Sequence, residues 1–119
     1  MAYRSFEELE VWKRACTLAV SVYRVLRDSR EYGLRDQMNR AAVSVPSNIA
    51  EGAERNSHKE YIQFLHIAKG SLAELRTQLY IAEKSGILTD SETKPLVSET
   101  KELPSMLQGL ITSLQKPLL

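Results

Sequence analysis

The amino-acid sequence predicts an all-α protein folded as an antiparallel up-down four-helix bundle. Apolar residues recur at alternating spacings of three and four in four segments, short connections separate these segments, and no alternating strand pattern competes. Such spacing places the apolar side chains on one stripe of each helix, as near-parallel packing requires. The 119 residues are expected to form one domain (1–119), with helices at about 6–28, 34–55, 58–85 and 90–115.

The first helix is expected over residues 6–28. Ser5 and Glu8 have the spacing of a capping box, in which each side chain satisfies a backbone donor at the helix start. The predicted apolar seam consists of Leu9, Trp12, Cys16, Ala19, Tyr23 and Leu26. Gly33 is expected in the connection to the second helix.

The second helix, residues 34–55, contains the most unusual segment, VSVPSNIAEGAERN at positions 43–56. Its predicted seam consists of Leu34, Met38, Ala41, Val45, Ile49 and Gly52. Proline within a helix costs roughly 3 kcal/mol and glycine about 1 kcal/mol relative to alanine. A packed helix that retains Pro46 and Gly52 uses them for geometry, close approach or a site.

Capping signals also delimit the third and fourth helices. Ser57 with Glu60 and Thr89 with Glu92 have capping-box spacing, and Gly86 is expected to end the third helix in a left-handed conformation. The predicted seams are Tyr61, Leu65, Ala68, Leu72, Leu75, Leu79 and Ala82, then Leu96, Thr100, Leu103, Leu107, Leu110 and Leu114. Pro104 is expected to kink or split the fourth helix, which also carries Pro95.

Three helices carry apolar or uncharged residues beyond their seams. These are Val11, Val20, Val22, Ala42, Val43, Phe64, Ile67, Ser71, Gln78 and Ile81. Such width indicates either a broad core stripe or burial against another copy of the chain, and we expect self-association.

A polar row follows the second helix at the spacing of its seam. The row consists of Gln37, Arg40, Ser44, Ser47, Glu51 and Arg55, with Asn48 beside it. It indicates a solvated face with ion pairs, a network at a subunit contact, or a groove facing a ligand. Asn48 and Glu51 are expected to be constrained, because Pro46 leaves the carbonyl of Ala42 without its helical donor.

The formal net charge of +1 gives no overall attraction to nucleic acid or membrane, but arginines concentrate near the first connection. The candidate nucleic-acid-binding residues are Arg24, Arg27, Arg30, Arg35, Arg40 and Arg55. Arginine suits phosphate, so RNA or DNA is a candidate partner. In the alternative interpretation these side chains pair locally, for instance Arg27 or Arg35 with Glu31.

Catalytic patterns find little support, and we expect no enzyme, no metal and no cofactor. Neither His58 nor His66 has a glutamate three residues before it, as di-iron bundles require. Cys16 lies on the predicted seam, where a thiol is more often packing than nucleophile. A single cysteine excludes an internal disulfide, and the apolar runs are short, so we expect a cytoplasmic location without a membrane partner.

The segments VSVPSNIAEGAER (43–55) and IAKGSLAELRTQL (67–79) resemble the 23S rRNA intervening-sequence proteins, a bacterial four-helix-bundle family. FEELEVWKRA at the first helix and the positions Ser57, Glu60, Tyr61 and Gly86 extend the likeness over essentially the whole chain. The family-motif residues, taken as structural or interface positions, are Pro46, Ser47, Asn48, Glu51, Gly52, Gly70, Ser71 and Glu74.

The resemblance implies a ring or barrel, in the form of a homopentamer, and assigns no catalytic residue. A related branch, the accessory variability determinant of diversity-generating retroelements, implies nucleic-acid binding through basic surfaces. The function expected is a nucleic-acid-associated scaffold. The alternatives are a protein–protein adaptor and, less favoured, a bundle that binds a small ligand or metal near Pro46.

Overall fold

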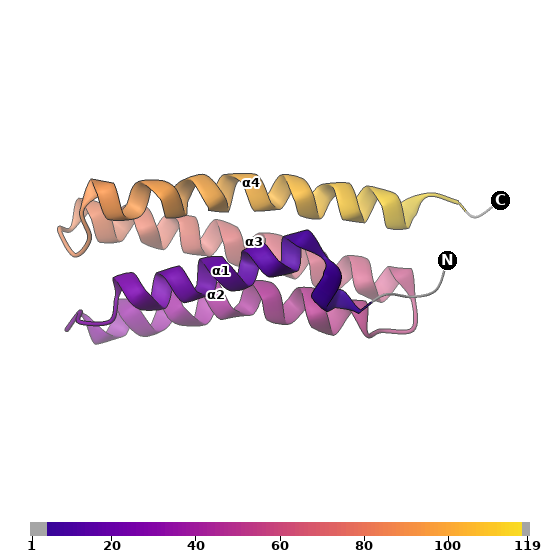
Figure 1. The fold of residues 1–119 in the computed structure, drawn as a ribbon, viewed down its shortest axis with the longest axis horizontal. Helices are drawn as coiled ribbons and strands as arrows, with labels where there is room; N and C mark the ends of the chain where they lie inside the picture. Colours follow the sequence, from indigo (N-terminus) through magenta and orange to yellow (C-terminus); the bar gives the residue numbers. More distant parts are fainter. Residues whose placement is uncertain (1–4, 118–119) are drawn as a thin grey trace.

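The computed structural model describes residues 5–117 as an elongated helical bundle of 54 × 19 × 19 Å. Its elements are a 3-10 helix, η1 (Phe6–Glu8), and the helices α1 (Glu10–Val25), α2 (Tyr32–Ala53), α3 (His58–Lys84) and α4 (Asp90–Gln115). Within the described residues there is no strand, as predicted. The α1–α2 and α3–α4 connections lie at one end of the bundle, and the α2–α3 connection lies at the other (Figure 1).

The first predicted helix is divided, and its start and part of its seam were predicted wrongly. Leu9 has an extended ψ of 125°, so η1 ends before α1 begins. The Ser5 hydroxyl accepts a hydrogen bond from the backbone N–H of Glu7, one residue earlier than a capping box requires. α1 then ends at Val25, three residues before the predicted end.

The core face of α1 matches the predicted seam at Ala19 and Leu26 and lies one position away from it elsewhere. The buried residues are Val11, Ala15, Leu18, Ala19, Val22 and, just beyond the helix, Leu26. Trp12 and Cys16 are only half-buried, and Tyr23 is 50% exposed. Two adjacent apolar rows satisfy the same helical spacing, and the row of smaller side chains packs inside.

α2 and α3 confirm their predicted seams, with only Leu34 and Tyr61 half-buried. Ser57 caps α3 by accepting from the Glu60 N–H. At the other end Gly86 has φ +82°, and the N–H of Ile87 donates to the Ala82 carbonyl at 2.9 Å. This six-residue closure is a Schellman motif, as the glycine predicted.

α4 continues from Asp90 to Gln115 through both prolines, so Pro104 does not split it. The Thr89–Glu92 capping box forms in both directions. Near the C-terminal end Ile111 is buried, whereas the predicted seam residues Leu110 and Leu114 are half-buried. None of the helices in residues 5–117 has a stretch long and apolar enough to cross a membrane.

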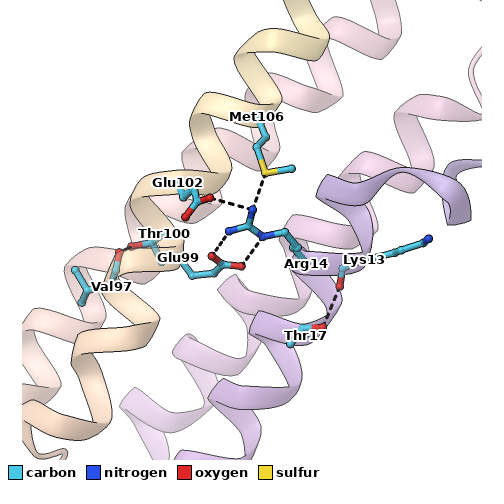
Figure 2. A network of polar contacts seen from close by, with 8 residues as sticks. All are labelled: Lys13, Arg14, Thr17, Val97, Glu99, Thr100, Glu102 and Met106. Carbon is cyan, nitrogen blue, oxygen red and sulfur yellow. Dashed lines mark hydrogen bonds and ion pairs between the residues drawn. The ribbon is translucent and has the colours of Figure 1, made fainter.

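One polar cluster joins α1 to α4. Arg14 donates from Nε to Glu99 at 3.0 Å, contacts Glu102 through Nη1 at 3.0 Å, and lies 3.4 Å from the Met106 sulfur (Figure 2). The pKa of Arg14 is raised by its hydrogen bonds to Glu99 and Glu102, and Arg14 lowers the pKa of Glu102. This cluster fixes the first helix against the last one.

Candidate nucleic-acid interface

A groove of about 700 Å³ lies between α1 and α2, toward the end of the bundle that carries their connection. It is lined by Tyr23, Leu26, Arg27, Arg35, Asp36, Asn39, Arg40 and Val43. It arises because Tyr23 of α1 and Arg27 of the turn that follows lie beside the core face of that helix, and because α2 presents Arg35, Asn39 and Val43 one turn apart on the neighbouring flank.

The groove carries three guanidinium groups and one carboxylate. Arg35 is positioned by three contacts: Asp36 at 3.4 Å, the Ser29 carbonyl at 3.5 Å, and the Tyr32 ring with its centroid 4.8 Å away. Arg27 and Arg40 are exposed, and their side chains form no ion pair or hydrogen bond with any residue of the described part. The groove therefore presents two uncommitted positive charges and one that is held in place.

The sequence analysis considered an ion pair of Arg27 or Arg35 with Glu31, and the structure shows a different partner. Among residues 5–117, neither Arg27 nor Arg35 pairs with Glu31, and Arg35 meets Asp36 instead. Glu31 is the residue before α2. Its side chain makes no capping hydrogen bond, and its backbone N–H donates to the Ser29 hydroxyl at 3.2 Å.

The remaining wall of the groove consists of an aromatic ring, apolar side chains and the amide group of Asn39. Tyr23 is 50% exposed and Val43 is 41% exposed. The side-chain oxygen of Asn39 is buried and accepts no hydrogen bond from any described residue. An acceptor in that state costs about 1–3 kcal/mol unless a donor reaches it.

The structure brings together only half of the arginines singled out by sequence. Arg24 lines a different hollow, beside the α3–α4 connection, with acidic neighbours that include Asp28 and Glu92. Arg30 is exposed in the α1–α2 connection. Arg55 follows the other end of α2, where it pairs with Glu51 at 3.1 Å and lies over the Phe64 ring. Arg27, Arg35 and Arg40 remain as the groove set.

The proline–glycine segment of α2 has a structural explanation in its contact with α3. A Cβ atom built on Gly52 would lie 2.7 Å from Phe64 Cβ and 3.2 Å from the Tyr61 carbonyl oxygen. Real Cβ contacts do not reach such distances, so glycine is required for the two helices to approach this closely. Pro46 is buried in the same helix, which continues through it.

Small polar groups continue this close α2–α3 contact. The hydroxyls of Ser44 and Ser71 are 2.8 Å apart. The Asn48 amide donates to the Ser44 carbonyl at 2.7 Å and to the Ser44 hydroxyl at 2.9 Å. Asn48 is therefore constrained, as expected, but its partner is Ser44 and not the Ala42 carbonyl. Asn48 lies four residues after Ser44, so its side chain is next to Ser44 on the same face of the helix.

The other motif positions differ in environment. Ser47 is exposed, and Gly70 has no atom within 4 Å of an added Cβ, so close packing does not explain that glycine. Glu74 is exposed and accepts a long, 3.5 Å hydrogen bond from Gln78. The other amide atom of Gln78, its oxygen, is buried without a partner among the described residues.

Residues 5–117 offer few side chains arranged for metal binding or for nucleophilic chemistry. No group of three or more histidine, cysteine or acidic side chains there is placed to hold a metal ion. The His58 ring nitrogen lies 3.2 Å from the Leu114 carbonyl oxygen. Cys16 is half-buried, and burial raises the pKa of its thiol, which disfavours the reactive thiolate.

Sequence reasoning missed Tyr23, Asn39 and Val43 as parts of one groove with the arginines. Tyr23 was placed on the seam, and Val43 was counted among excess apolar residues. The arginine cluster was a usable signal, but which flank of α1 faces α2 depends on the register of packing.

Comparison with known proteins agrees with the fold. The family model for 23S rRNA-intervening sequence proteins matches residues 7–109. A crystal structure of a protein of unknown function from the S23 ribosomal protein family of Bacteroides thetaiotaomicron has a TM-score of 0.80, covering 85% of this chain and 97% of that one. At 20% identity, this likeness shows a shared helical fold. No curated protein matches the chain.

Proposed function

We propose that this chain, which belongs to the 23S rRNA-intervening sequence protein family, is a non-enzymatic, homo-oligomeric scaffold that associates with nucleic acid. The observation that carries the proposal is the α1–α2 groove, in which Arg27 and Arg40 have no partner among the described residues. Guanidinium groups without an internal carboxylate are available to phosphate, with which they form charge-assisted hydrogen bonds.

A single groove supplies only weak binding. With a net charge of +1, attraction is local to this end of the bundle rather than a property of the whole surface. Two or three phosphate contacts release few counterions, so the binding free energy that they supply is small. Added salt reduces it further, and the affinity of one groove is low at physiological ionic strength. Repetition of the groove around an oligomer would raise the affinity through effective concentration.

Exposed apolar side chains support self-association. Val20 on α1 is about half exposed, as are Ile67 and Ile81 on α3. Apolar side chains exposed on two different helices allow a head-to-tail contact, which closes into a ring when the rotation permits. The alternating ends of the helix connections support an antiparallel bundle as the unit of such a ring, and a homopentamer is the assembly we propose.

A double substitution with a matched control tests the nucleic-acid role. Arg27→Gln with Arg40→Gln should remove most RNA retention at low salt. Arg24→Gln with Arg30→Gln removes the same charge from the same end of the bundle but outside the groove, and should retain most of it. Equal losses would show that only general charge matters, and no retention by the unmodified protein would refute the proposal.

Light scattering tests the assembly separately. A mass of several subunits at micromolar concentration is expected, and Ile67→Ser with Ile81→Ser should reduce it if α3 contributes to the contact. A monomer mass for the unmodified protein would remove both the ring and the gain in affinity from repetition.

A protein adaptor is the second candidate, and the exposed Ile67 and Ile81 favour it. In that case a partner should co-purify in fixed ratio and survive nuclease treatment, while RNA retention stays absent. The small-ligand alternative loses its proposed groups, because Asn48 and Glu51 are engaged by Ser44 and Arg55.

A further inference from the structure

The geometry points to a single strand of nucleic acid, rather than a duplex, as the ligand of the α1–α2 groove. This inference rests on the proposed nucleic-acid role and adds the conformation of the ligand to it. Two features of the groove carry it: the concave position of its arginines and a half-exposed aromatic ring in its wall.

The arginines line a hollow from both sides. Arg27 comes from the end of α1, and Arg35 and Arg40 come from the first half of α2. Proteins that read a duplex usually insert a projecting helix or ribbon into the major groove, which is about 12 Å wide. A hollow between two packed helices has the opposite shape, and a flexible single strand is able to follow it.

Tyr23 supplies a surface for a base. Its ring shares the groove with the arginines and is 50% exposed. The described aromatic rings near the other end of α1 are already paired, since Phe6 and Trp12 pack edge to face with centroids 5.3 Å apart. Stacking on an aromatic ring is available to an unpaired base but not to a base inside a duplex.

Arg35 favours an ordered ligand. It is held by Asp36, Ser29 and Tyr32, so little of its side-chain freedom remains to be lost on binding.

Fluorescence anisotropy with two RNA probes tests the inference. One probe is an unstructured pyrimidine oligonucleotide, and the other is a hairpin duplex with the same number of phosphates, both at one low salt concentration. The single strand should bind at least about fivefold more tightly, because one of its bases stacks on the Tyr23 ring. Tyr23→Ala should weaken the single strand by about 5–150-fold and leave the duplex unchanged.

Two control variants accompany this measurement. Tyr23→Phe keeps the ring and should keep single-strand binding. Tyr80→Ala removes a tyrosine of similar exposure from α3, outside the groove, and should have no effect. Far-ultraviolet circular dichroism and thermal unfolding establish that each variant is folded.

Photocrosslinking of the unmodified protein keeps the inference testable if Tyr23→Ala does not fold. Trypsin releases residues 15–24 as one peptide, in which Tyr23 is the aromatic residue. Crosslinks from the single strand should map to this peptide. Equal binding of both probes, or crosslinks only elsewhere, overturns the single-strand inference and leaves the proposed function standing. No binding of either probe overturns the proposed function as well.

Discussion

At the scale of single residues, replacement by alanine is expected to have opposite effects on the free energy of unfolding at Gly52 and at Gly70. An added Cβ at Gly52 would meet Phe64 and Tyr61 at 2.7–3.2 Å, whereas at Gly70 it meets nothing within 4 Å. Gly52→Ala should therefore lower the free energy of unfolding by about 1–3 kcal/mol through overpacking, despite its better helix propensity. Urea denaturation measures this change.

Gly70→Ala is the matched control in the neighbouring helix. It should raise the free energy of unfolding by about 0.5–1 kcal/mol, because alanine has the lower conformational entropy cost in a helix. Stabilisation by both substitutions would show that α2 and α3 have room to spare at Gly52, and would contradict the explanation given for the motif glycine.

Gln78 gives a second prediction at this scale. Its side chain is buried, its oxygen has no donor among the described residues, and its nitrogen makes one long bond to Glu74. Gln78→Met conserves the volume and removes the unsatisfied oxygen, so thermal unfolding should show a gain of about 1–3 kcal/mol. A loss of stability would indicate that a donor from another subunit satisfies the oxygen.

At the scale of elements, the caps and stops of α3 and α4 were predictable because their causes are local. Ser57, Thr89 with Glu92, and Gly86 act on backbone groups within a few residues, and all three signals mark true boundaries. The α1 seam was not predictable, since Val11 and Trp12, like Val22 and Tyr23, offer two adjacent apolar rows. Packing against α2 and α4 decides between such rows, and spacing along one helix does not.

The prolines of α4 lead to the prediction at this scale. Pro104 lacks the N–H that would donate to the Thr100 carbonyl, yet α4 continues through it. Pro104→Ala should restore that bond and raise the free energy of unfolding by about 2–2.6 kcal/mol, which is the roughly 3 kcal/mol helix penalty of proline less about 0.4–1 kcal/mol for the freer unfolded chain. Urea denaturation measures the change, and an unaltered midpoint would mean that the Thr100 carbonyl already has a donor.

At the scale of the whole molecule, the bundle and the presence of a basic region followed from the sequence, but the composition of the groove did not. Six arginines were candidates, and three of them line one groove. Arg55 lies at the far end of α2 because a helix separates residues along its axis by about 1.5 Å each. Tyr23 lines the groove because a neighbouring row of α1 side chains, and not its own, packs into the core.

The Arg14 cluster also escaped prediction, because its members lie more than eighty residues apart in the chain. Arg14 on α1 contacts Glu99 and Glu102 on α4, so the first and last helices are joined by charge as well as by apolar packing (Figure 2). The hydrogen bond and the positive charge of Arg14 hold the pKa of Glu102 below its ordinary value of 4.5. This link makes part of the stability of the bundle depend on pH.

The sign of that dependence follows from the lowered pKa. Because the folded state favours ionised Glu102, its contribution is fully present above the ordinary pKa of 4.5 and is lost as pH falls through the lower, folded value. Glu102→Gln should therefore lower Tm at neutral pH, and the difference from the unmodified protein should shrink as pH falls through the lowered pKa of Glu102, because the carboxyl then becomes protonated and uncharged. Differential scanning calorimetry from neutral to acid pH measures this difference. A Tm difference that stays constant down to acid pH would show that Glu102 acts through packing rather than through its charge, and a difference that grows on acidification would reverse the assigned direction of the pKa shift.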